Sequence, residues 1–322
     1  MRAFVTGATG FIGGHFVRRL RARGDDVVAL VRSPDRAETL RDAGVELVEG
    51  DASDPAAVRR AADGCDAAFH LAGMYRVGIR PRERPAMYQA NVRSTEVVLD
   101  AAAEAGVPRI LYVSTCNVFG NTRGRIVDEA YERPAADGFL SYYDETKYLA
   151  HLAAAERIAH DVPIVIVQPG AVYGRDDHSE VGWMIDQLRK GRLWFRLFPE
   201  LGMTFVHVDD VAGGIVLAYE GGVSGQSYIL GGEVARMGEV VDRAAAIIGR
   251  RPPRLAVPPR VVRMSAPLGP IAARLLGTPA NLSEAVRAAH GVTYWATDAK
   301  ARRELGYAPR SLDVGLRETL SG

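Results

Sequence analysis

The sequence is poor in cysteine and in long apolar runs, and each shortage excludes a class of protein. Its 322 residues include two cysteines, Cys65 and Cys116, which are too far apart in the chain to indicate a disulfide framework or a metal site. No apolar run approaches the roughly 20 residues that cross a bilayer, and no early apolar run follows a basic segment as in a secretion signal. We therefore expect a protein of the reducing cytoplasm with no membrane span.

An excess of charge of one sign is also lacking. The chain has 40 lysines and arginines against 39 acidic residues, which leaves a formal net charge of +1. No overall field would attract nucleic acid or an anionic membrane. Because 48% of the residues are hydrophobic, a chain of this length can bury a large core. The remaining expectation is a soluble globular protein that acts on a small molecule and not on nucleic acid.

A short apolar run followed by spaced glycines opens the chain. Residues 3–5 predict a buried strand, Gly7, Gly10 and Gly13 follow, and a helical pattern continues through 16–20. Such glycines let the backbone approach a pyrophosphate and let the helix pack closely on the strand, while the helix N-terminus offers unpaired N–H groups. We expect a dinucleotide here; the alternative is an ordinary tight strand-to-helix connection. The contacts are expected from Gly7, Thr9, Gly10, Phe11, Ile12 and Gly13.

Strand and helix patterns alternate after this turn. Further strands are expected at 26–31, 45–51, 66–73, 109–115 and 163–170. Alternation of this kind predicts an α/β protein with a doubly wound parallel sheet and right-handed crossovers. The ligand of such a sheet binds at the carboxyl ends of its strands, so polar residues at those ends are candidates for chemistry.

Arg32 stands at the end of the second predicted strand, where an NAD site needs an acidic residue. An acid there binds the ribose 2′-hydroxyl of NAD, whereas arginine suits the 2′-phosphate of NADP. With Ser33 beside it and Arg36 one turn later, the sequence favours NADP(H) over NAD, although Arg32 could also be an ordinary surface arginine. Asp51 and Ala52 follow the third strand, where an adenine ring could be held; Asp51 equally suits a turn or a helix cap.

A tyrosine and a lysine four residues apart open the helix that is predicted from 141 to about 160. Tyr143 and Lys147 share one face of this helix, and the chain has only three lysines. A nearby ammonium favours the phenolate, which a tyrosine with an ordinary pKa of about 10 needs if it is to exchange protons at pH 7. Tyr143 would then exchange a proton with a substrate oxygen, and Thr115, at the end of the fifth strand, would hold that oxygen.

Three other polar features have two interpretations each. His70 ends the fourth strand and could face the cofactor, but a lone histidine beside small residues is typical of a structural group. Asn91, near the start of a helix predicted over 85–105, could anchor a water or a backbone group behind Lys147, or could cap or pack the helix. Residues 176–178 form a polar cluster that we interpret as solvated and not as a metal site.

The composition changes beyond residue 170. Apolar and aromatic residues cluster at Trp183, Met184, Trp194, Phe195 and Phe198. We interpret them as packing within a smaller lobe in preference to substrate contacts. Helices are expected near 236–248, 258–276 and 281–290, with strands at 204–208 and 227–230. We expect a dinucleotide-binding Rossmann domain at 1–170, its sheet completed by about 204–220, and a substrate-binding lobe at 171–203 and 221–322.

Several segments together resemble the extended short-chain dehydrogenase/reductase family, also called the NAD-dependent epimerase/dehydratase family. They are 6–13, 50–51, 70–73, 91–92, 113–120, 143–147, 205–212 and 305–309. The resemblance implies catalysis by Thr115, Tyr143, Lys147 and Asn91, and NADP(H) binding by the glycines and Arg32. It also implies a homodimer that forms through the two long helices. The cofactor-binding set is completed by Leu71, Ala72, Gly73, Tyr143, Lys147, Pro169 and Gly170.

Two positions depart from the family members that act on nucleotide sugars. Those members carry an asparagine after the sixth strand and an arginine before the Phe-Val-His-Val strand, where this chain has Ala171 and Met203. Without that arginine a pyrophosphate loses its usual bidentate donor. The chain is more similar to the dihydroflavonol 4-reductase-like branch, which predicts an NADP(H)-dependent carbonyl reductase that interconverts a ketone or aldehyde and its alcohol on an apolar or ring substrate. The alternatives are a nucleotide-sugar epimerase or dehydratase with tightly bound NAD, and a cofactor sensor without turnover.

Overall fold

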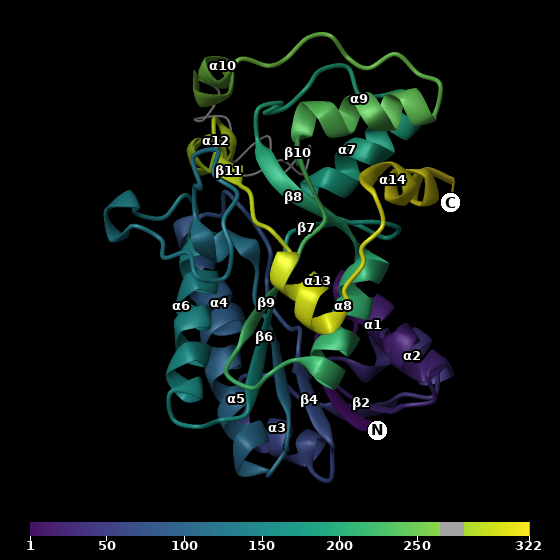
Figure 1. Ribbon diagram of the computed structural model, residues 1–322, viewed down its shortest axis with the longest axis vertical. Coiled ribbons are helices and arrows are strands. Elements are labelled where there is room, and N and C mark those ends of the chain that lie inside the picture. The colour runs from purple at the N-terminus through teal and green to yellow at the C-terminus, as the bar shows by residue number, and fades with distance from the viewer. Residues whose placement is uncertain (265–279, 322) are drawn as a thin grey trace.

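The larger of two sheets is parallel throughout, in a computed structural model that describes residues 1–264 and 280–321 (Figure 1). Its strand order is β3-β2-β1-β4-β5-β6-β9, and each neighbouring pair is parallel. The strands are β1 (Arg2–Thr6), β2 (Asp26–Val31), β3 (Glu46–Glu49), β4 (Ala67–His70), β5 (Ile110–Val113), β6 (Ile164–Pro169) and β9 (Ser227–Leu230). The predicted doubly wound α/β sheet is confirmed.

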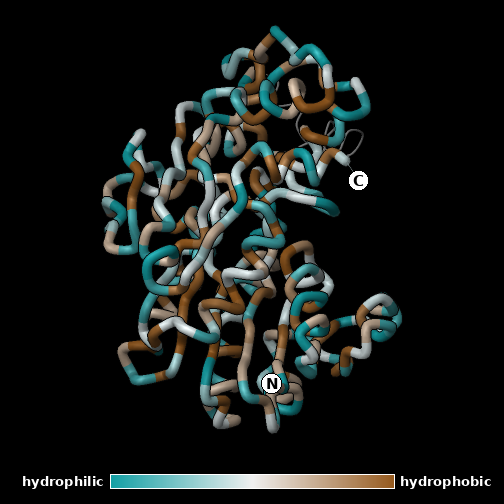
Figure 2. Tube along the Cα trace, turned by 45° about the vertical axis from the view of Figure 1, so that its right-hand side comes forward, coloured by the Kyte–Doolittle hydropathy of each residue, from teal (hydrophilic) through white to brown (hydrophobic). Residues whose placement is uncertain are grey.

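Helices cover both faces of this sheet. One face packs against α1 (Phe11–Ala22), α2 (Glu38–Asp42), α8 (Val208–Gly221) and α13 (Ala299–Leu305). The other packs against α3 (Pro55–Ala62), α5 (Ser94–Glu104) and α6 (Tyr142–Ile158). Successive side chains of a strand face opposite layers, so Phe4 packs in one core and Val5 in the other. Because both faces of the strand are buried, its sequence is a continuous apolar run. In Figure 2 the hydrophobic colour accordingly runs through the interior of this layered part.

The helix predicted over 85–105 is one continuous run of three segments. α4 (Arg84–Tyr88) leads into a π-helical turn, η3 (Gln89–Arg93), and then into α5. A π-turn holds one more residue than an α-turn and commonly marks a functional position. Here it carries Asn91, which is buried.

The strand near Thr204 does not complete the large sheet, contrary to the sequence-based expectation. β8 (Gly202–His207) pairs instead with β7 (Ala171–Tyr173), β10 (Glu233–Arg236) and β11 (Thr293–Tyr294) in a second sheet. The seventh strand of the large sheet is β9, which lies within the range that the sequence predicts for the lobe. The error has a physical cause: a buried apolar strand has the same pattern in either sheet. The helix after β8 does return to the large sheet, because α8 packs on α1.

The second sheet and its helices form a lobe over the carboxyl ends of the parallel strands (Figure 1). Its helices are α7 (Glu180–Arg189), α9 (Met237–Ile247), α10 (Pro259–Met264), α12 (Leu282–Ala289) and α14 (Leu312–Ser321). Helices α7, α9 and α14 share one apolar core. The helix predicted at 258–276 begins as α10, and its part from 265 onward lies outside the described residues. No helix in the described ranges has the length and apolar character needed to span a membrane.

Candidate active site

The glycine-rich turn joins β1 to α1 at the carboxyl edge of the large sheet. Gly7 has φ +75°, and a Cβ there would lie 2.6 Å from the amide nitrogen of Ala72. A Cβ on Gly13 would lie 2.0 Å from the carbonyl oxygen of Gly7, so α1 approaches the turn this closely only with glycine. Gly10 caps α1 without a side-chain hydrogen bond, which leaves the first N–H groups of the helix available to an anion. The cradle therefore fits a dinucleotide pyrophosphate.

The other predicted contacts of this turn lie where the sequence placed them. Phe11 and Ile12 form the first turn of α1 and are partly buried, whereas Thr9 is exposed. Leu71 and Ala72 follow β4, and their backbone packs against Gly7. The structure thus brings the first and fourth strand ends together at one edge.

Arg32 and Asp51 lie at the ends of neighbouring strands, away from the predicted catalytic residues. Arg32 is exposed directly after β2, and Arg36 is exposed on the short 3-10 turn that follows. The carboxylate of Asp51 accepts hydrogen bonds from the Ser53 backbone N–H (2.9 Å) and hydroxyl (2.6 Å). These bonds, together with the charge of Arg32, lower the pKa of Asp51. Asp51 is thus a turn residue, and Arg32 is close enough to act on it; partly buried Ala52 follows.

Tyr143, Thr115 and Lys147 meet where β5 ends and α6 begins. Ser141 caps α6 by accepting a hydrogen bond from the Asp144 backbone N–H, which fixes the first turn and the buried side chain of Tyr143. Thr115 follows β5; its hydroxyl donates to Asn117 Oδ1 (3.2 Å) and lies close enough to Tyr143 to lower the pKa of that phenol. Lys147, one turn farther along α6, is also buried. Three residues from two separate motifs thus share one site.

The ammonium of Lys147 is held by the sheet and not by the phenol of Tyr143. Its Nζ donates to the Tyr112 hydroxyl (3.2 Å) and to the Val113 carbonyl oxygen (3.1 Å). Burial raises the pKa of Tyr143, the charge of Asp144 raises it further, and the hydroxyl of Thr115 opposes both. The expected lowering by lysine therefore does not arise within the chain itself, because Lys147 is bonded elsewhere. Two bonds leave the ammonium a third N–H donor.

Asn91 anchors a backbone segment next to α6. Its Oδ1 accepts from the Met74 N–H (2.6 Å), and its Nδ2 donates to the Met74 carbonyl oxygen (3.1 Å) and the Thr146 hydroxyl (2.9 Å). It therefore ties the loop after β4 to the residue that precedes Lys147. Of the two interpretations left open, the backbone anchor describes this geometry, and Asn91 caps no helix.

His70 is a structural residue, as the sequence favoured. It hydrogen-bonds with the hydroxyls of Thr6 (2.8 Å) and Thr95 (3.0 Å) and is completely buried. Burial, helped by the charge of Lys147, lowers the pKa of His70 to about 3. His151 on α6 hydrogen-bonds with the Ser114 hydroxyl (3.1 Å), and the same causes lower its pKa to about 4. Both imidazoles are neutral at pH 7, so the positive charge of this region is that of Lys147.

Tyr75 is a residue of this site that the sequence did not single out. Its ring lies edge-on to that of Tyr143, with centroids 4.9 Å apart, and 46% of the residue is exposed. Burial raises the pKa of the Tyr75 phenol, and the charge of Glu180 at the start of α7 raises it further, so Tyr75 lies between the large sheet and the lobe. The irregular loop that carries it has no hydrophobic period, which is why no sequence signal marked it.

Asp144 forms a buried polar cluster directly beside Tyr143. Its carboxylate accepts hydrogen bonds from Asn117 Nδ2 (3.0 Å) and the Tyr294 hydroxyl (3.2 Å). Burial raises the pKa of Asp144 to about 6, although these hydrogen bonds oppose the rise. Because Asn117, Asp144 and Tyr294 are far apart in the chain, no local pattern could have joined them.

The end of β6 lies against the lobe. A Cβ on Gly170 would lie 2.1 Å from the Thr204 carbonyl oxygen, so the turn from Pro169 into β7 packs closely on β8. In the 176–178 cluster, Asp177 bonds the Ser179 N–H (2.8 Å) and hydroxyl (2.9 Å) at the start of α7. Within the described ranges, no group of three His, Cys, Asp or Glu residues could hold a metal ion.

The lobe aromatics divide into buried and exposed members. Met184 is buried in the lobe core, as expected. The packing interpretation is wrong for Trp183, Trp194 and Phe195, which are 48%, 79% and 42% exposed. Composition alone could not separate the two groups, because the exposed ones lie on the outer side of α7 and in the loop after it.

A seven-stranded parallel sheet with this glycine turn, and a tyrosine, lysine and threonine at its carboxyl edge, define the extended short-chain dehydrogenase/reductase class. Residues 3–231 match the NAD dependent epimerase/dehydratase family, and the chain belongs to that family. The family depends on nicotinamide dinucleotides and includes oxidoreductases.

Curated relatives match most or all of the chain. Sterol demethylase protein B of Methylococcus capsulatus is 31% identical over 327 aligned residues, which cover 100% of this chain and 98% of the relative. A putative dihydroflavonol 4-reductase of Synechocystis is 32% identical over 262 aligned residues, covering 79% of this chain and 75% of the relative.

Solved structures share the whole fold. The crystal structure of gox2253 superposes with a TM-score of 0.84 at 32% identity, and the match covers 99% of this chain and 96% of that one. DesIV of Streptomyces venezuelae, a dTDP-glucose 4,6-dehydratase with NAD bound, gives a TM-score of 0.79 at 25% identity, over 100% of this chain and 96% of that one. The chain is thus similar both to reductases and to enzymes of nucleotide sugars.

Proposed function

We propose that this protein is an NADP(H)-dependent carbonyl reductase that interconverts a ketone or aldehyde and its alcohol on an apolar or ring substrate. The observation that carries the proposal is the meeting of Tyr143, Thr115 and Lys147 at the sheet edge that also holds the glycine turn. Two relatives support the ketone chemistry by name: a quinoline-oxide ketoreductase of Stigmatella aurantiaca, 32% identical, and a 2-alkyl-3-oxoalkanoate reductase of Stenotrophomonas maltophilia, 29% identical.

Different residues would bind different parts of the dinucleotide. The turn at Gly7–Gly13 and the N-terminus of α1 would hold the pyrophosphate, and Arg32 would pair with a 2′-phosphate. Asp51 and Ala52 would border the adenine, while Pro169 and Gly170 would border the nicotinamide. When bound, the nicotinamide supplies or accepts the hydride. The cradle fits the group because a side chain at position 7 or 13 would fill it.

Tyr143 would donate a proton to the substrate oxygen in reduction and take it back in oxidation. Thr115, whose hydroxyl donates to Asn117 Oδ1 in the free protein, would turn that donor to the same oxygen and fix its position. Lys147 would use its third N–H for a ribose hydroxyl and would keep a positive charge near the phenol. Asn91 would act through Thr146 and the Met74 backbone as a positioning residue.

The residues around Tyr143 support an apolar or ring substrate. Tyr75 offers an aromatic edge beside the phenol. At the positions where nucleotide-sugar enzymes hold a pyrophosphate, Ala171 lies in β7 and Met203 in β8, and neither can bind an anion. A nucleotide-sugar epimerase or dehydratase with tightly bound NAD remains the alternative that the experiment must distinguish.

A cofactor titration followed by a turnover screen tests the proposal. The purified protein should bind NADPH at least tenfold more tightly than NADH and should consume NADPH with aromatic or aliphatic ketones. Tyr143→Phe should abolish turnover and leave NADPH binding intact, whereas Tyr142→Phe, one residue earlier on α6, should retain activity. Protein that arrives with bound NAD and shows no net redox turnover would instead support the epimerase alternative.

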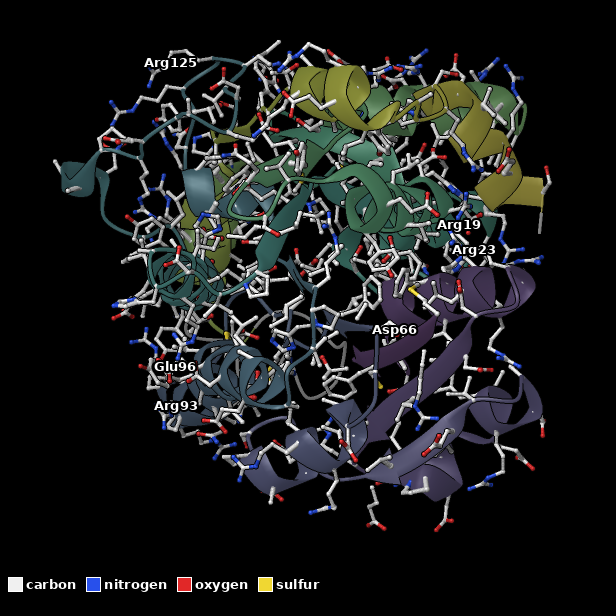
Figure 3. All side chains as sticks on the ribbon, turned by 60° about the horizontal axis from the view of Figure 1, so that its bottom comes forward. Arg19, Arg23, Asp66, Arg93, Glu96 and Arg125 are labelled. Carbon is white, nitrogen blue, oxygen red and sulfur yellow. The ribbon has the colours of Figure 1, made fainter. Side chains whose placement is uncertain are left out.

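We also propose a homodimer formed through the outer faces of α4, α5 and α6. Helices α5 and α6 lie side by side, and exposed apolar side chains lie on α4 (Tyr88) and on α6 (Leu152). Arg93 and Glu96 point outward from the same region and pair at 2.5 Å (Figure 3). Light scattering at micromolar concentration tests the dimer, and Leu152→Arg should shift it toward monomer. A wild-type monomer would refute this proposal.

A further inference from the structure

Two segments of the lobe expose large apolar side chains to solvent. Among the described residues, the large apolar side chains with the highest exposure are Met264, Trp194 and Leu255, at 82%, 79% and 74%. Val261 and Phe195, in the same two segments, are 52% and 42% exposed. We call these five residues the apolar patch. Single exposed apolar residues are common on protein surfaces, but a contiguous group of them marks a surface that contacts a partner or a membrane.

The two segments of the apolar patch lie together at one end of the molecule. The Arg196 N–H donates to the Leu255 carbonyl oxygen (2.8 Å), and the Val257 N–H donates to the Arg196 carbonyl oxygen (3.1 Å). Trp194 and Phe195 are therefore neighbours of Leu255. The chain then continues directly into α10, which carries Val261 and Met264. Figure 1 shows the segment between α9 and α10 crossing the top of the lobe, at one end of the longest axis.

Arginines without acidic partners surround the apolar patch. Residues 243–283 contain seven arginines and neither aspartate nor glutamate, in a chain whose net charge is only +1. Arg243 forms ion pairs with Glu233 and Asp313, so its charge is neutralised within the lobe. Six other arginines of the two segments are exposed and pair with no described carboxylate: Arg192, Arg250, Arg251, Arg254, Arg260 and Arg263.

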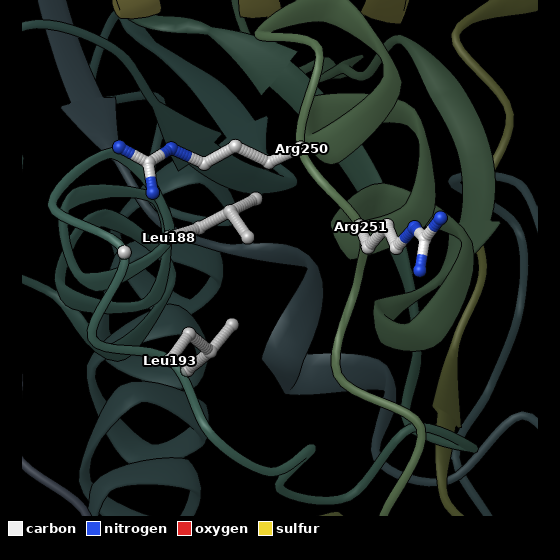
Figure 4. A pocket seen from close by; sticks show the side chains of 5 residues that line it. Leu188, Leu193, Arg250 and Arg251 are labelled. Carbon is white, nitrogen blue, oxygen red and sulfur yellow. The ribbon is translucent and has the colours of Figure 1, made fainter.

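A hollow beside the apolar patch combines both kinds of side chain. It measures about 190 Å³ and lies between the end of α7 and the end of α9, with Leu188, Gly191, Leu193, Arg250 and Arg251 as its lining. In Figure 4 the two leucines lie on one side, the guanidinium group of Arg250 extends toward that side, and the guanidinium group of Arg251 points away from it. An apolar floor with a cationic rim suits the phosphate and first carbons of a lipid.

We propose that this end of the lobe docks on the surface of an anionic phospholipid membrane. The apolar patch would enter the headgroup layer, and the six arginines would bind lipid phosphates. A bilayer surface is apolar in its interior and negatively charged at its headgroups, which matches exposed apolar side chains interleaved with six arginines that pair with no described carboxylate. One carboxylate of this end, that of Asp242, is bound by Arg196. A second copy of the chain would bring six arginines against six, so like charges disfavour self-association here. Nucleic acid would leave the apolar patch without a partner.

Vesicle sedimentation with the full chain tests the docking surface. The protein should sediment with vesicles of equal phosphatidylglycerol and phosphatidylcholine in 50 mM salt, and much less in 500 mM salt or with pure phosphatidylcholine. Leu255→Ser with Met264→Ser should lower the bound fraction at least fivefold, as should Arg251→Glu with Arg254→Glu. Val223→Ser, at a residue that is 59% exposed outside the patch, is the matched control and should bind as the wild type does.

Folding and self-association are checked on the same variants. Each variant should keep the wild-type melting temperature, because the substituted side chains are exposed. Three outcomes would overturn the proposal: no sedimentation with anionic vesicles in 50 mM salt, equal binding of both double variants and the wild type, or equal binding to pure phosphatidylcholine. It would also be overturned if light scattering showed a self-association that Leu255→Ser with Met264→Ser removed, since the patch would then join two copies of the chain.

Discussion

Tyr75 stands edge-on to Tyr143, with ring centroids 4.9 Å apart and ring planes at 87°. The loop that holds Tyr75 is tied to α6 through Met74 and Asn91, and the charge of Glu180 in the lobe acts on the Tyr75 phenol. The loop that Asn91 ties to α6 thus places an aromatic side chain next to the proposed catalytic phenol of Tyr143. A ring substrate that approaches Tyr143 would lie against this aromatic edge.

Tyr75→Ala should weaken the binding of ring substrates. An aromatic contact contributes about 1 kcal/mol, so KM for a cyclic ketone should rise roughly fivefold, with a smaller rise for a short aliphatic ketone. Tyr75→Phe keeps the ring and loses only the hydroxyl, and should change KM little. Steady-state kinetics on both substrates checks this. An unchanged KM for the cyclic ketone in the alanine variant would place the substrate elsewhere.

Arg32→Ala should reduce the preference for NADPH. A hydrogen-bonded charge pair contributes about 1.5–3 kcal/mol, so the dissociation constant for NADPH should rise at least tenfold. Binding of NADH should stay within about twofold, because it lacks the 2′-phosphate. Fluorescence titration of both cofactors measures this, and Arg60→Ala, an exposed arginine on α3, serves as the control. Equal losses for the two cofactors would contradict a 2′-phosphate contact.

Asp144→Asn should shift the pH dependence of alcohol oxidation toward lower pH. The charge of Asp144 helps to raise the pKa of Tyr143, so its removal should make the phenol easier to ionise. We expect the alkaline limb of the kcat profile to move down by roughly one pH unit. Any step near pH 6 that follows ionisation of Asp144 itself should disappear. A melting temperature for the variant separates this effect from loss of the cluster with Asn117 and Tyr294.

The buried neutral His70 should make the protein less stable as pH falls below about 6.5. The pKa of His70 is about 3 in the folded chain and lies below its value in the unfolded chain. Between these two pH values the unfolded chain binds a proton at this histidine and the folded chain does not. The contribution of neutral His70 to the free energy of unfolding is fully present above pH 6.5 and is lost progressively as the pH falls toward 3. At pH 5 the loss from this residue is about 2 kcal/mol. Urea unfolding from pH 7 to 5 measures it.

A substituted histidine supplies the control for this pH effect. His70→Gln should flatten the dependence of the urea midpoint on pH, whereas His160→Gln, at an exposed residue, should keep the wild-type slope. If His70→Gln retained the full slope, the pH dependence would have to come from other groups.

Local patterns predicted the fold class and the residues of the proposed catalytic centre. The glycine turn and the pair Tyr143 and Lys147 are each set by spacing within one element, and the structure brings both to the same sheet edge. Spacing could not show that Lys147 would bond to Tyr112 and Val113. That contact joins segments that are more than 30 residues apart.

Non-local features were missed for the same reason. Strands β8 and β9 are both apolar, and only their partners show which one completes the large sheet. Tyr75 and Tyr294 reach the site from distant loops and strands. The net charge of +1 gives no sign of the local positive charge at residues 243–283, because acidic residues elsewhere in the chain balance the charge of these arginines. An average over the chain contains no information on where charges gather.

The return of the chain from β8 through α8 to β9 limits where the protein can be divided. A fragment that ended at residue 170 would keep β6 but lose β9, its parallel neighbour, and would lose α8 from its place on α1. The wholly buried strand β6 would become an open edge with unpaired backbone groups, which is a typical starting point for aggregation. The first 170 residues contain the glycine turn and the proposed catalytic residues, yet the last strand that makes them a stable sheet is supplied from beyond residue 226.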